Sequence, residues 1–344
     1  MKAAREKEST PVTTAPTREP SQPTPPAGPY VETATGPVST SDLGFTLMHE
    51  HIFGLSEGVF ANFPSVWDAE ADRKRAVELL SRLKGSGVST LVDLTVLGTG
   101  RNVPLVQQVA RESGMHVIVA TGLYTYDELP HYFQARSVDH MVDLFVQDIT
   151  EGVQGTSARA AILKCATDHA GVTPGVEKVL RAVARAHRRT GVPISTHTEA
   201  KSQQGLAQQE VFDSEGVDLS RVISGHSGDT EDIDYLTKLL ERGSYIGMDR
   251  FGLDFFLPTD KRVAVVARLC EMGYAGRMVL SHDAAVYMDF LTPEVQRALG
   301  TKWNYFHILN DVLPALRQAG VSEEQIRLMT VENPRRIFEN VGSY

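Results

Sequence analysis

The sequence predicts an α/β fold, namely a (β/α)8 TIM barrel in which eight parallel strands alternate with helices. From residue 44 onward, short apolar runs alternate with amphipathic segments, and Gly or Pro residues bound the runs. Strands that are buried on both faces have this continuous apolar pattern. A histidine, lysine or aspartate also stands at the end of several runs. An open doubly wound sheet is the alternative, but it normally carries a glycine-rich loop after its first strand, where this chain has His49-Glu50-His51.

The expected strands are short and rich in Val, Ile, Leu or Ala. They cover residues 44–49, 88–95, 116–121, 160–165, 192–197, 221–225, 244–249 and 277–282. Helices are expected between them, at about 69–84, 229–242 and 259–272 among others. The clearest helix begins at Thr173-Pro174 and ends at Gly191, because Thr is a favourable N-cap, Pro suits the first helical position, and Gly commonly follows the last turn.

The first 40 residues have a different composition from the rest of the chain. They hold eight of the seventeen prolines, many Ser and Thr, and no apolar periodicity. This predicts a disordered Pro/Thr-rich tail over residues 1–40 and one barrel domain over residues 41–344. The tail lacks the apolar central run of a signal peptide, which argues against export by that route.

Composition and charge exclude several classes of function. The formal net charge is −9 and the chain has no strongly basic stretch, so we expect no nucleic-acid partner. No run of about 18 apolar residues exists, so no membrane span is expected. Two cysteines, Cys165 and Cys270, do not make a disulfide framework, and a reducing cytoplasm fits them.

Four histidines and one aspartate lie where the expected strands end, which predicts a metal site. His49 and His51 are two apart, so both imidazoles can face the barrel interior while Glu50 turns outward toward the helices. His197 and His226 end the fifth and sixth strands, and Asp283 follows the last. Active sites of such barrels lie at the carboxyl ends of the strands. The alternatives are locally packed histidines and, for Asp283, a helix N-cap.

Lys164 is the unusual member of this set, because an ammonium has no lone pair for a metal. It ends the fourth strand in Ile162-Leu163-Lys164. One interpretation is that Lys164 is an ordinary charged lysine whose ammonium reaches the solvent from the end of the strand. Burial beside cations would instead favour the neutral amine, which can add carbon dioxide and become an anionic carbamate. The adjacent Cys165 then faces outward and is expected to act as a small buried hydrophobe rather than as a nucleophile.

In this order, His49-x-His51, Lys164, His197, His226 and Asp283 resemble the ligand set of the phosphotriesterase branch of the amidohydrolase superfamily. Further segments resemble the phosphotriesterase-like lactonases: Gly122-Leu-Tyr-Thr-Tyr126, Ser224-Gly-His-Ser-Gly-Asp229, Gly247-Met-Asp-Arg-Phe-Gly-Leu-Asp254 and Glu332-Asn-Pro-Arg335. The resemblance implies two divalent metal ions, zinc or alternatively cobalt, iron or manganese. One would be held by His49, His51 and Asp283, and the other by His197 and His226. N6-carboxylated Lys164 and a hydroxide would bridge them.

The same resemblance implies the substrate side of the site. Tyr124, Tyr126, Arg250 and Phe290 would bind substrate, and Asp283, Tyr124 and Arg250 would take part in catalysis. The implied function is a quorum-quenching type of lactonase that hydrolyses N-acyl-homoserine lactones and other lactones, with weak organophosphate hydrolase activity, in a homodimer. The alternatives are an aromatic at Tyr124 that only packs, and an ion pair of Arg250 with Asp249 or Asp254. At the level of function they are a primary phosphotriesterase or carboxylesterase on the same site, or a metal-bound barrel used only for binding.

Overall fold

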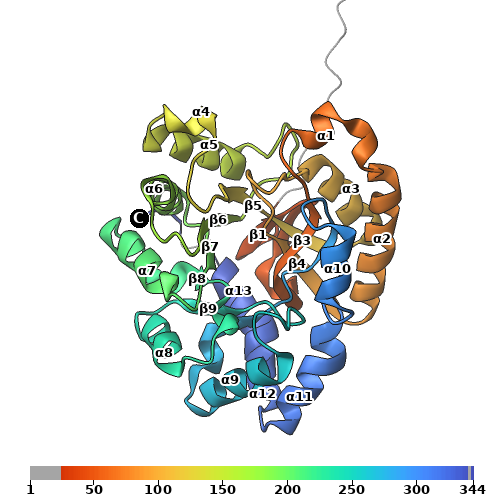
Figure 1. Cartoon of the computed structure of the whole chain (residues 1–344), viewed down its shortest axis with the longest axis vertical. Helices are drawn as coiled ribbons and strands as arrows, with labels where there is room; N and C mark the ends of the chain where they lie inside the picture. Colours follow the sequence, from red (N-terminus) through yellow and green to blue (C-terminus); the bar gives the residue numbers. More distant parts are fainter. Residues whose placement is uncertain (1–24, 340–341) are drawn as a thin grey trace, which may run out of the picture.

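The computed structural model of the protein describes residues 25–339 and 342–344, and within them the chain forms a (β/α)8 barrel (Figure 1). Every pair of neighbouring strands in its sheet is parallel, in the order β10-β9-β8-β7-β6-β5-β4-β3-β11. The strands are β3 (Phe45–Gly54), β4 (Val88–Asp93), β5 (His116–Gly122), β6 (Ile162–Thr167), β7 (Ile194–Thr198), β8 (Val222–Ser224), β9 (Tyr245–Met248), β10 (Met278–Leu280) and β11 (Ala285–Met288). The eight expected strands are confirmed with end shifts of a few residues.

The barrel closes between β10 and β3 through individual hydrogen bonds. The amide of Asp283 donates to the carbonyl oxygen of His49 at 3.0 Å, and the amide of His49 donates to Ser281 Oγ at 2.9 Å. Beyond Asp283 the chain pairs with β3 again as β11, a short strand that the sequence did not predict. Asp283 therefore lies in a break between two segments that both neighbour β3.

Helices surround the barrel (Figure 1). They are α1 (Val59–Asn62), α2 (Ala69–Gly85), α3 (Val103–Ser113), α4 (His131–Gln134), α5 (Val138–Thr150), α6 (Pro174–Thr190), α7 (Gln204–Ser214), α8 (Ile233–Glu241), α9 (Thr259–Glu271), α10 (Pro293–Leu299), α11 (Leu313–Gln318), α12 (Glu323–Arg327) and α13 (Asn333–Phe338). The side chain of Thr173 caps α6 and Gly191 ends it, as predicted. The helix expected from 229 begins later, because residues 227–229 form a 3₁₀ turn and Asp232 caps α8.

Strand alternation divides the buried side chains into those inside the barrel and those under the helices. Val92, Ile118, Ile162, Ile223 and Val279 belong to one cluster. Their strand neighbours pack in two other clusters with residues of the helices. Along β6 this alternation places Ile162 and Lys164 on the inner face, and it places Cys165 among helix residues, fully buried. The prediction of Cys165 as a small buried hydrophobe is confirmed.

Part of the predicted tail is ordered, so the expected boundary at residue 40 is wrong. Strands β1 (Tyr30–Thr33) and β2 (Gly36–Ser39) form an antiparallel hairpin. The amide of Ala34 donates to the carbonyl oxygen of Val117 on β5 at 2.7 Å, and both Val31 and Ala34 are buried. These contacts with the barrel stabilise a segment whose own sequence has no strong periodicity. Residues 1–24 of the predicted tail lie outside the described residues.

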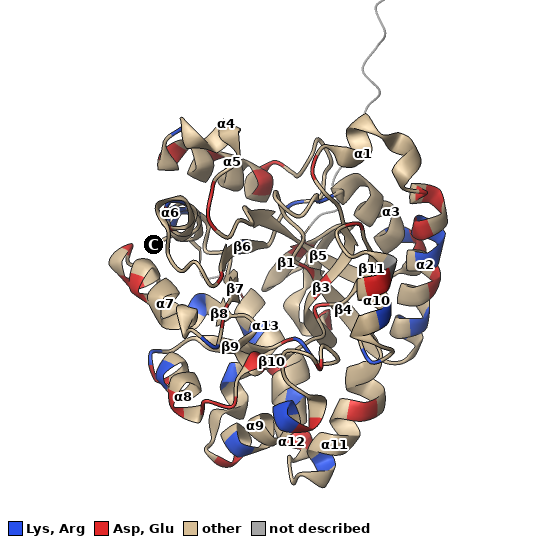
Figure 2. Ribbon diagram, viewed as in Figure 1, with Lys and Arg blue, Asp and Glu red and all other residues tan. Residues whose placement is uncertain are grey.

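Charged residues are interleaved on the outer helices. Figure 2 shows acidic and basic residues side by side on α2, α8 and α9. Among the described residues, no helix has both the length and the apolar character that a bilayer span requires.

Candidate metal centre

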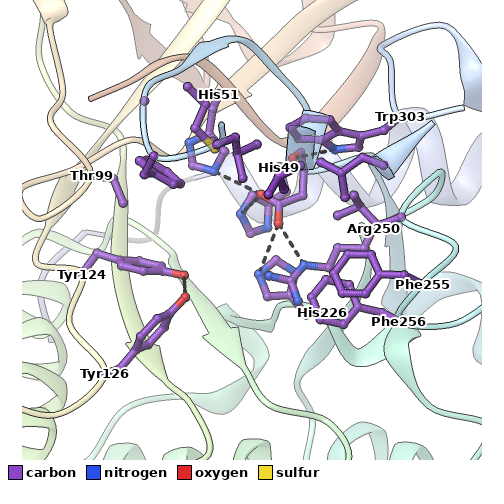
Figure 3. A pocket seen from close by; sticks show the side chains of 18 residues that line it. His49, His51, Thr99, Tyr124, Tyr126, His226, Arg250, Phe255, Phe256 and Trp303 are labelled. Atoms are coloured by element: carbon purple, nitrogen blue, oxygen red, sulfur yellow. Dashed lines mark hydrogen bonds and ion pairs between the residues drawn. The ribbon is translucent and has the colours of Figure 1, made fainter. Parts of the chain in front are cut away.

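The imidazoles predicted from the sequence converge on the Asp283 carboxylate at the carboxyl ends of the strands. His49 Nε2 and His51 Nε2 lie 3.5 and 3.1 Å from Asp283 Oδ1, and His226 Nε2 lies 3.8 Å from Oδ2. The ring of His197 contacts the ring of His226, with 4.6 Å between centroids. Figure 3 shows His49, His51 and His226 grouped together in the pocket. The structure thus brings together residues from four strands, β3, β7, β8 and β10.

Each of these histidines has a fixed partner on its other ring nitrogen. Asp249 Oδ2 lies 2.8 Å from His49 Nδ1, and its Oδ1 lies 3.0 Å from His226 Nδ1. His51 Nδ1 lies 2.8 Å from Thr95 Oγ1, whose hydroxyl donates to Asp93. His197 is held the other way round, with its Nε2 2.8 Å from Asp168 Oδ2.

Local backbone geometry aims two of these residues. His226 and Asp283 have φ angles of 58° and 55°, the left-handed region that non-glycine residues seldom adopt. The amide of His226 donates to Asp249 Oδ1 at 2.7 Å, which holds the turn after β8. Asp283 is held by the bond from its amide to His49. Such positions cost free energy and are common where a side chain must point into a site. Asp283 does not cap a helix, so that alternative is wrong.

Lys164 lies in the same cluster with its side chain fully buried. Its Nζ is 3.1 Å from His49 Nε2. Burial lowers the pKa of Lys164 to about 8, because the surroundings solvate an ammonium poorly. Burial also lowers the pKa of His197 to about 4 and that of His226 well below its usual value, so both rings are neutral near pH 7. Neutral imidazoles are the form that ligates metals.

The donor set fits a divalent cation. One donor atom each from His49, His226 and Asp283 lies within 4.8 Å of the others. Ligand atoms bound at about 2.0–2.2 Å to one tetrahedral ion lie about 3.3–3.6 Å from one another, close to the separations between Asp283 and the imidazole nitrogens. Nitrogen and carboxylate donors together suit zinc and its first-row neighbours.

Tyr124, Tyr126 and Arg250 approach this cluster from the side of the cavity. Tyr124 Oη lies 2.9 Å from His197 Nδ1 and 2.6 Å from Tyr126 Oη. Burial raises the pKa of Tyr124 well above 10, so its phenol keeps its proton. Arg250 pairs with Asp283 and Asp229. The alternative partners are held elsewhere, Asp249 by the histidines and Asp254 by Lys302.

A cavity of about 240 Å³ opens directly onto the cluster. All four expected substrate-binding residues line it, including Phe290. Its remaining wall is mostly apolar and consists of Thr99, Gly54, Leu253, Phe255, Phe256, Met288, Leu291, Val295, Leu299 and Trp303. In Figure 3, Tyr124 and Tyr126 lie across the cavity from Phe255, Phe256 and Trp303. The site therefore joins a polar floor to an apolar channel.

The residues that hold the histidines were not predicted from the sequence. Asp93 ends β4, Asp168 follows β6, and Asp249 follows β9, so each shows the same strand-end signal as the expected ligands. That signal does not distinguish a metal ligand from a residue that orients one. Glu50 does turn outward, but its carboxylate accepts from Ser281 Oγ and from the amides of residues 282 and 284 rather than from a helix.

Comparisons with known proteins identify the family. The sequence profile of the "Phosphotriesterase family" matches residues 29–338. The chain belongs to the phosphotriesterase family. A relative named "Phosphotriesterase homology protein" from Mycobacterium tuberculosis (strain ATCC 25618 / H37Rv) is 52% identical over 324 residues, which cover 92% of this chain and 99% of the relative. An "Aryldialkylphosphatase" from Saccharolobus solfataricus is 42% identical over 303 residues, which cover 88% and 96% respectively.

A solved structure supports the same assignment. The "Structure of the phosphotriesterase from Mycobacterium tuberculosis" superimposes with a TM-score of 0.89 at 52% identity, and the match covers 92% of this chain and 100% of that one. The chain is therefore a phosphotriesterase-family hydrolase on a (β/α)8 barrel, and the histidine cluster at the carboxyl ends of its strands is the candidate metal centre of that hydrolase.

Proposed function

We propose that this phosphotriesterase-family hydrolase is a binuclear metal-dependent lactonase acting on N-acyl-homoserine lactones and other lactones, with weaker hydrolysis of organophosphate triesters. The observation that carries the proposal is the cavity, whose polar floor and long apolar wall match a lactone ring with an acyl chain. A small polar ester would leave that apolar wall exposed to water. Each methylene of an acyl chain buried against it would contribute about 0.8 kcal/mol.

The residues that would hold two metals are those of the cluster. His49, His51 and Asp283 would bind one ion, His197 and His226 the other, and a carbamate on Lys164 would reach both. The lowered pKa of Lys164 supports this, because only the neutral amine adds carbon dioxide. When bound, zinc or a related divalent metal would lower the pKa of water and polarise the substrate carbonyl.

The side chains around the cluster would supply orientation and proton transfer. The Tyr124 phenol is a fixed O–H donor beside His197, so it can donate to an oxygen of the lactone. Arg250 presents its guanidinium to the cavity and can hold the ester carbonyl while it stays paired with Asp283. Asp283 can accept the proton of the attacking water and return it to the leaving alkoxide.

Primary phosphotriesterase activity is the second candidate. It is favoured by the 42% identity to a protein named "Aryldialkylphosphatase". The two candidates share the site and differ in the substrate group that the cavity favours.

One rate comparison separates the candidates. Purified, metal-replete protein would be assayed with homoserine lactones of increasing acyl length, with an unsubstituted lactone, and with paraoxon. A lactonase gives its largest kcat/KM on an acylated lactone, and Phe290→Ala reduces that preference for long chains. A larger kcat/KM on paraoxon than on every lactone would favour the phosphotriesterase. No turnover of any substrate would favour a binding barrel.

Metal analysis tests the cofactor proposal separately. Reconstituted protein should hold about two equivalents of divalent metal, since six candidate ligands exceed what one tetrahedral ion accepts. A single equivalent with full activity would contradict the binuclear arrangement.

We also propose that the enzyme is a homodimer. Val59, Phe63 and Val66, on α1 and the turn after it, are 39%, 62% and 52% exposed and form an apolar surface that a second copy could cover. Light scattering on the eluted protein should give twice the monomer mass of 37.7 kDa. Phe63→Lys should lower that mass.

A further inference from the structure

One of the four histidines is held by a carboxylate through the opposite ring nitrogen. His49, His51 and His226 have Nδ1 held by Asp249 or Thr95 and direct Nε2 toward Asp283. His197 has Nε2 2.8 Å from Asp168 Oδ2, and its Nδ1 lies 2.9 Å from Tyr124 Oη. Asp168 therefore stands where it could decide which nitrogen of this ring carries the proton.

Asp168 is itself oriented by its neighbour. It directly follows β6, and its Oδ1 accepts the backbone amide of His169 at 2.7 Å. The His169 imidazole also lies 2.6 Å from Oδ1, but that side chain is 82% exposed. Oδ1 is thus occupied by a donor that cannot move, and Oδ2 is left for His197.

We propose that Asp168 is a positioning residue that keeps the proton of His197 on Nε2 and so directs the Nδ1 lone pair to a metal. The proposal rests on the metal centre proposed above and concerns a residue outside its ligand set. A carboxylate only accepts hydrogen bonds, so the nitrogen facing it must carry the hydrogen. A neutral imidazole has one N–H, and its other nitrogen is then free to ligate. The Tyr124 phenol can donate to that free nitrogen when no metal is bound.

Replacing Asp168 with asparagine should move the proton of His197 to its other ring nitrogen. In Asp168→Asn, the amide of His169 still requires an acceptor, so the asparagine oxygen takes the place of Oδ1 and its NH₂ faces His197. An NH₂ group donates, so Nε2 would have to accept and the proton would move to Nδ1. Nδ1–H then points at the metal position. The near-isosteric Asn variant should therefore bind metal no better than Asp168→Ala, although it changes the shape of the side chain less.

The first measurement requires no metal. Protein with ¹⁵N-labelled histidine, prepared without metal, is compared by NMR with His197→Asn to assign the ring nitrogens of His197. We expect a protonated Nε2 and an unprotonated Nδ1 in the wild-type chain, and the reverse in Asp168→Asn. An Nδ1–H tautomer in the wild-type protein, or an unchanged tautomer in Asp168→Asn, would overturn the proposal.

The second measurement is zinc affinity, determined by competition with a chelator. Asp168→Ala should weaken the more sensitive site by about 10–100-fold, the usual effect of removing a residue that holds a metal-binding histidine. Asp168→Asn should weaken it at least as much. His169→Ala is the matched control: it keeps the backbone amide, so its affinity should stay near wild type. Wild-type affinity in both Asp168 variants overturns the proposal.

The two proposals fail in different ways. If the wild-type chain binds no zinc, the proposed metal centre fails, while the tautomer measurement still decides the role of Asp168. If the wild-type chain binds two zinc ions and both Asp168 variants do the same, the metal centre stands and Asp168 has no positioning role. Thermal unfolding of each metal-free variant shows whether lost affinity reflects lost folding.

Discussion

Arg250 and Asp283 are joined by a buried contact, with Arg250 Nε 2.9 Å from Asp283 Oδ2. The same guanidinium contacts Asp229 at 3.0 Å through Nη1 and lies over the ring of Phe256, 4.6 Å from its centroid. One cation thus connects the carboxylate proposed to carry the proton with the wall of the cavity. The carbonyl group of the proposed lactone substrate would meet a donor that is already oriented.

Arg250→Ala should weaken substrate binding more than it changes metal content. The variant removes a donor to the ester but none of the proposed ligands, and a hydrogen bond to a charged group contributes about 1.5–3 kcal/mol. We expect KM for an acyl-homoserine lactone to rise by about tenfold or more. Steady-state kinetics and elemental analysis measure the two effects. Lost metal with an unchanged KM would mean that Arg250 only supports Asp283.

Tyr124→Phe should lower lactone turnover by up to about 100-fold, the scale seen when one donor to a developing oxyanion is removed. The metal content should not change, because the phenol contacts His197 but belongs to no proposed ligand set. Tyr126→Phe is the control, since its hydroxyl contacts Tyr124 rather than a histidine. It should have the smaller effect on kcat. Loss of metal in Tyr124→Phe would show that the phenol supports the site structurally.

Lys164→Ala should lose activity and bind metal more weakly, because it deletes an anionic group proposed to contact both ions. Acetate or propionate can enter the vacated space and supply two oxygens, so these acids should restore part of the activity. Alkylamines should not. Titrating the variant with each additive distinguishes the two chemistries, and rescue by an amine alone would rule out the carbamate.

Carbamate formation on the metal-free chain should follow the lowered pKa of Lys164. When the pH is below this pKa of about 8, most of the amine is protonated and has no lone pair for carbon dioxide. When the pH is above it, most of the amine is neutral. The ¹³C carbamate signal in labelled bicarbonate should therefore increase as the pH rises toward 8 and level off above it. An ordinary lysine would continue to gain signal toward its usual pKa near 10.4. Lys164→Ala gives the background signal.

Arg262→Met should destabilise the protein by about 3–5 kcal/mol, because it leaves a buried partner charge less compensated. Arg262 is 1% exposed and lies 2.6 Å from Asp229 Oδ1. It also donates to the carbonyl oxygens of Gly228, Leu253 and Leu257. Urea unfolding gives the change in free energy. Lys261→Met is the control: its exposed pair with Glu231 should contribute about 0–1 kcal/mol.

Strand positions could be predicted because strands buried on both faces must be apolar along their whole length. The N-cap of α6 at Thr173 and its end at Gly191 could also be predicted, because local backbone chemistry determines both. The hairpin of residues 30–39 could not be predicted, because its order depends on a bond between Ala34 and Val117, far away in the chain. Strand β11 depends in the same way on pairing with β3.

The sequence by itself determined which side chains meet at the carboxyl ends of the strands. His49, His51, Lys164, His197, His226 and Asp283 are recognisable because strand-end positions meet in space whenever parallel strands close into a barrel. Only the tertiary structure decided how each side chain is held. Asp249 contacts His49 from 200 positions away, and Asp168 contacts Nε2 of His197 rather than Nδ1. Such hydrogen bonds depend on differences of a few tenths of an ångström in the separation of segments that share no local pattern. Spacing along the chain therefore cannot specify them.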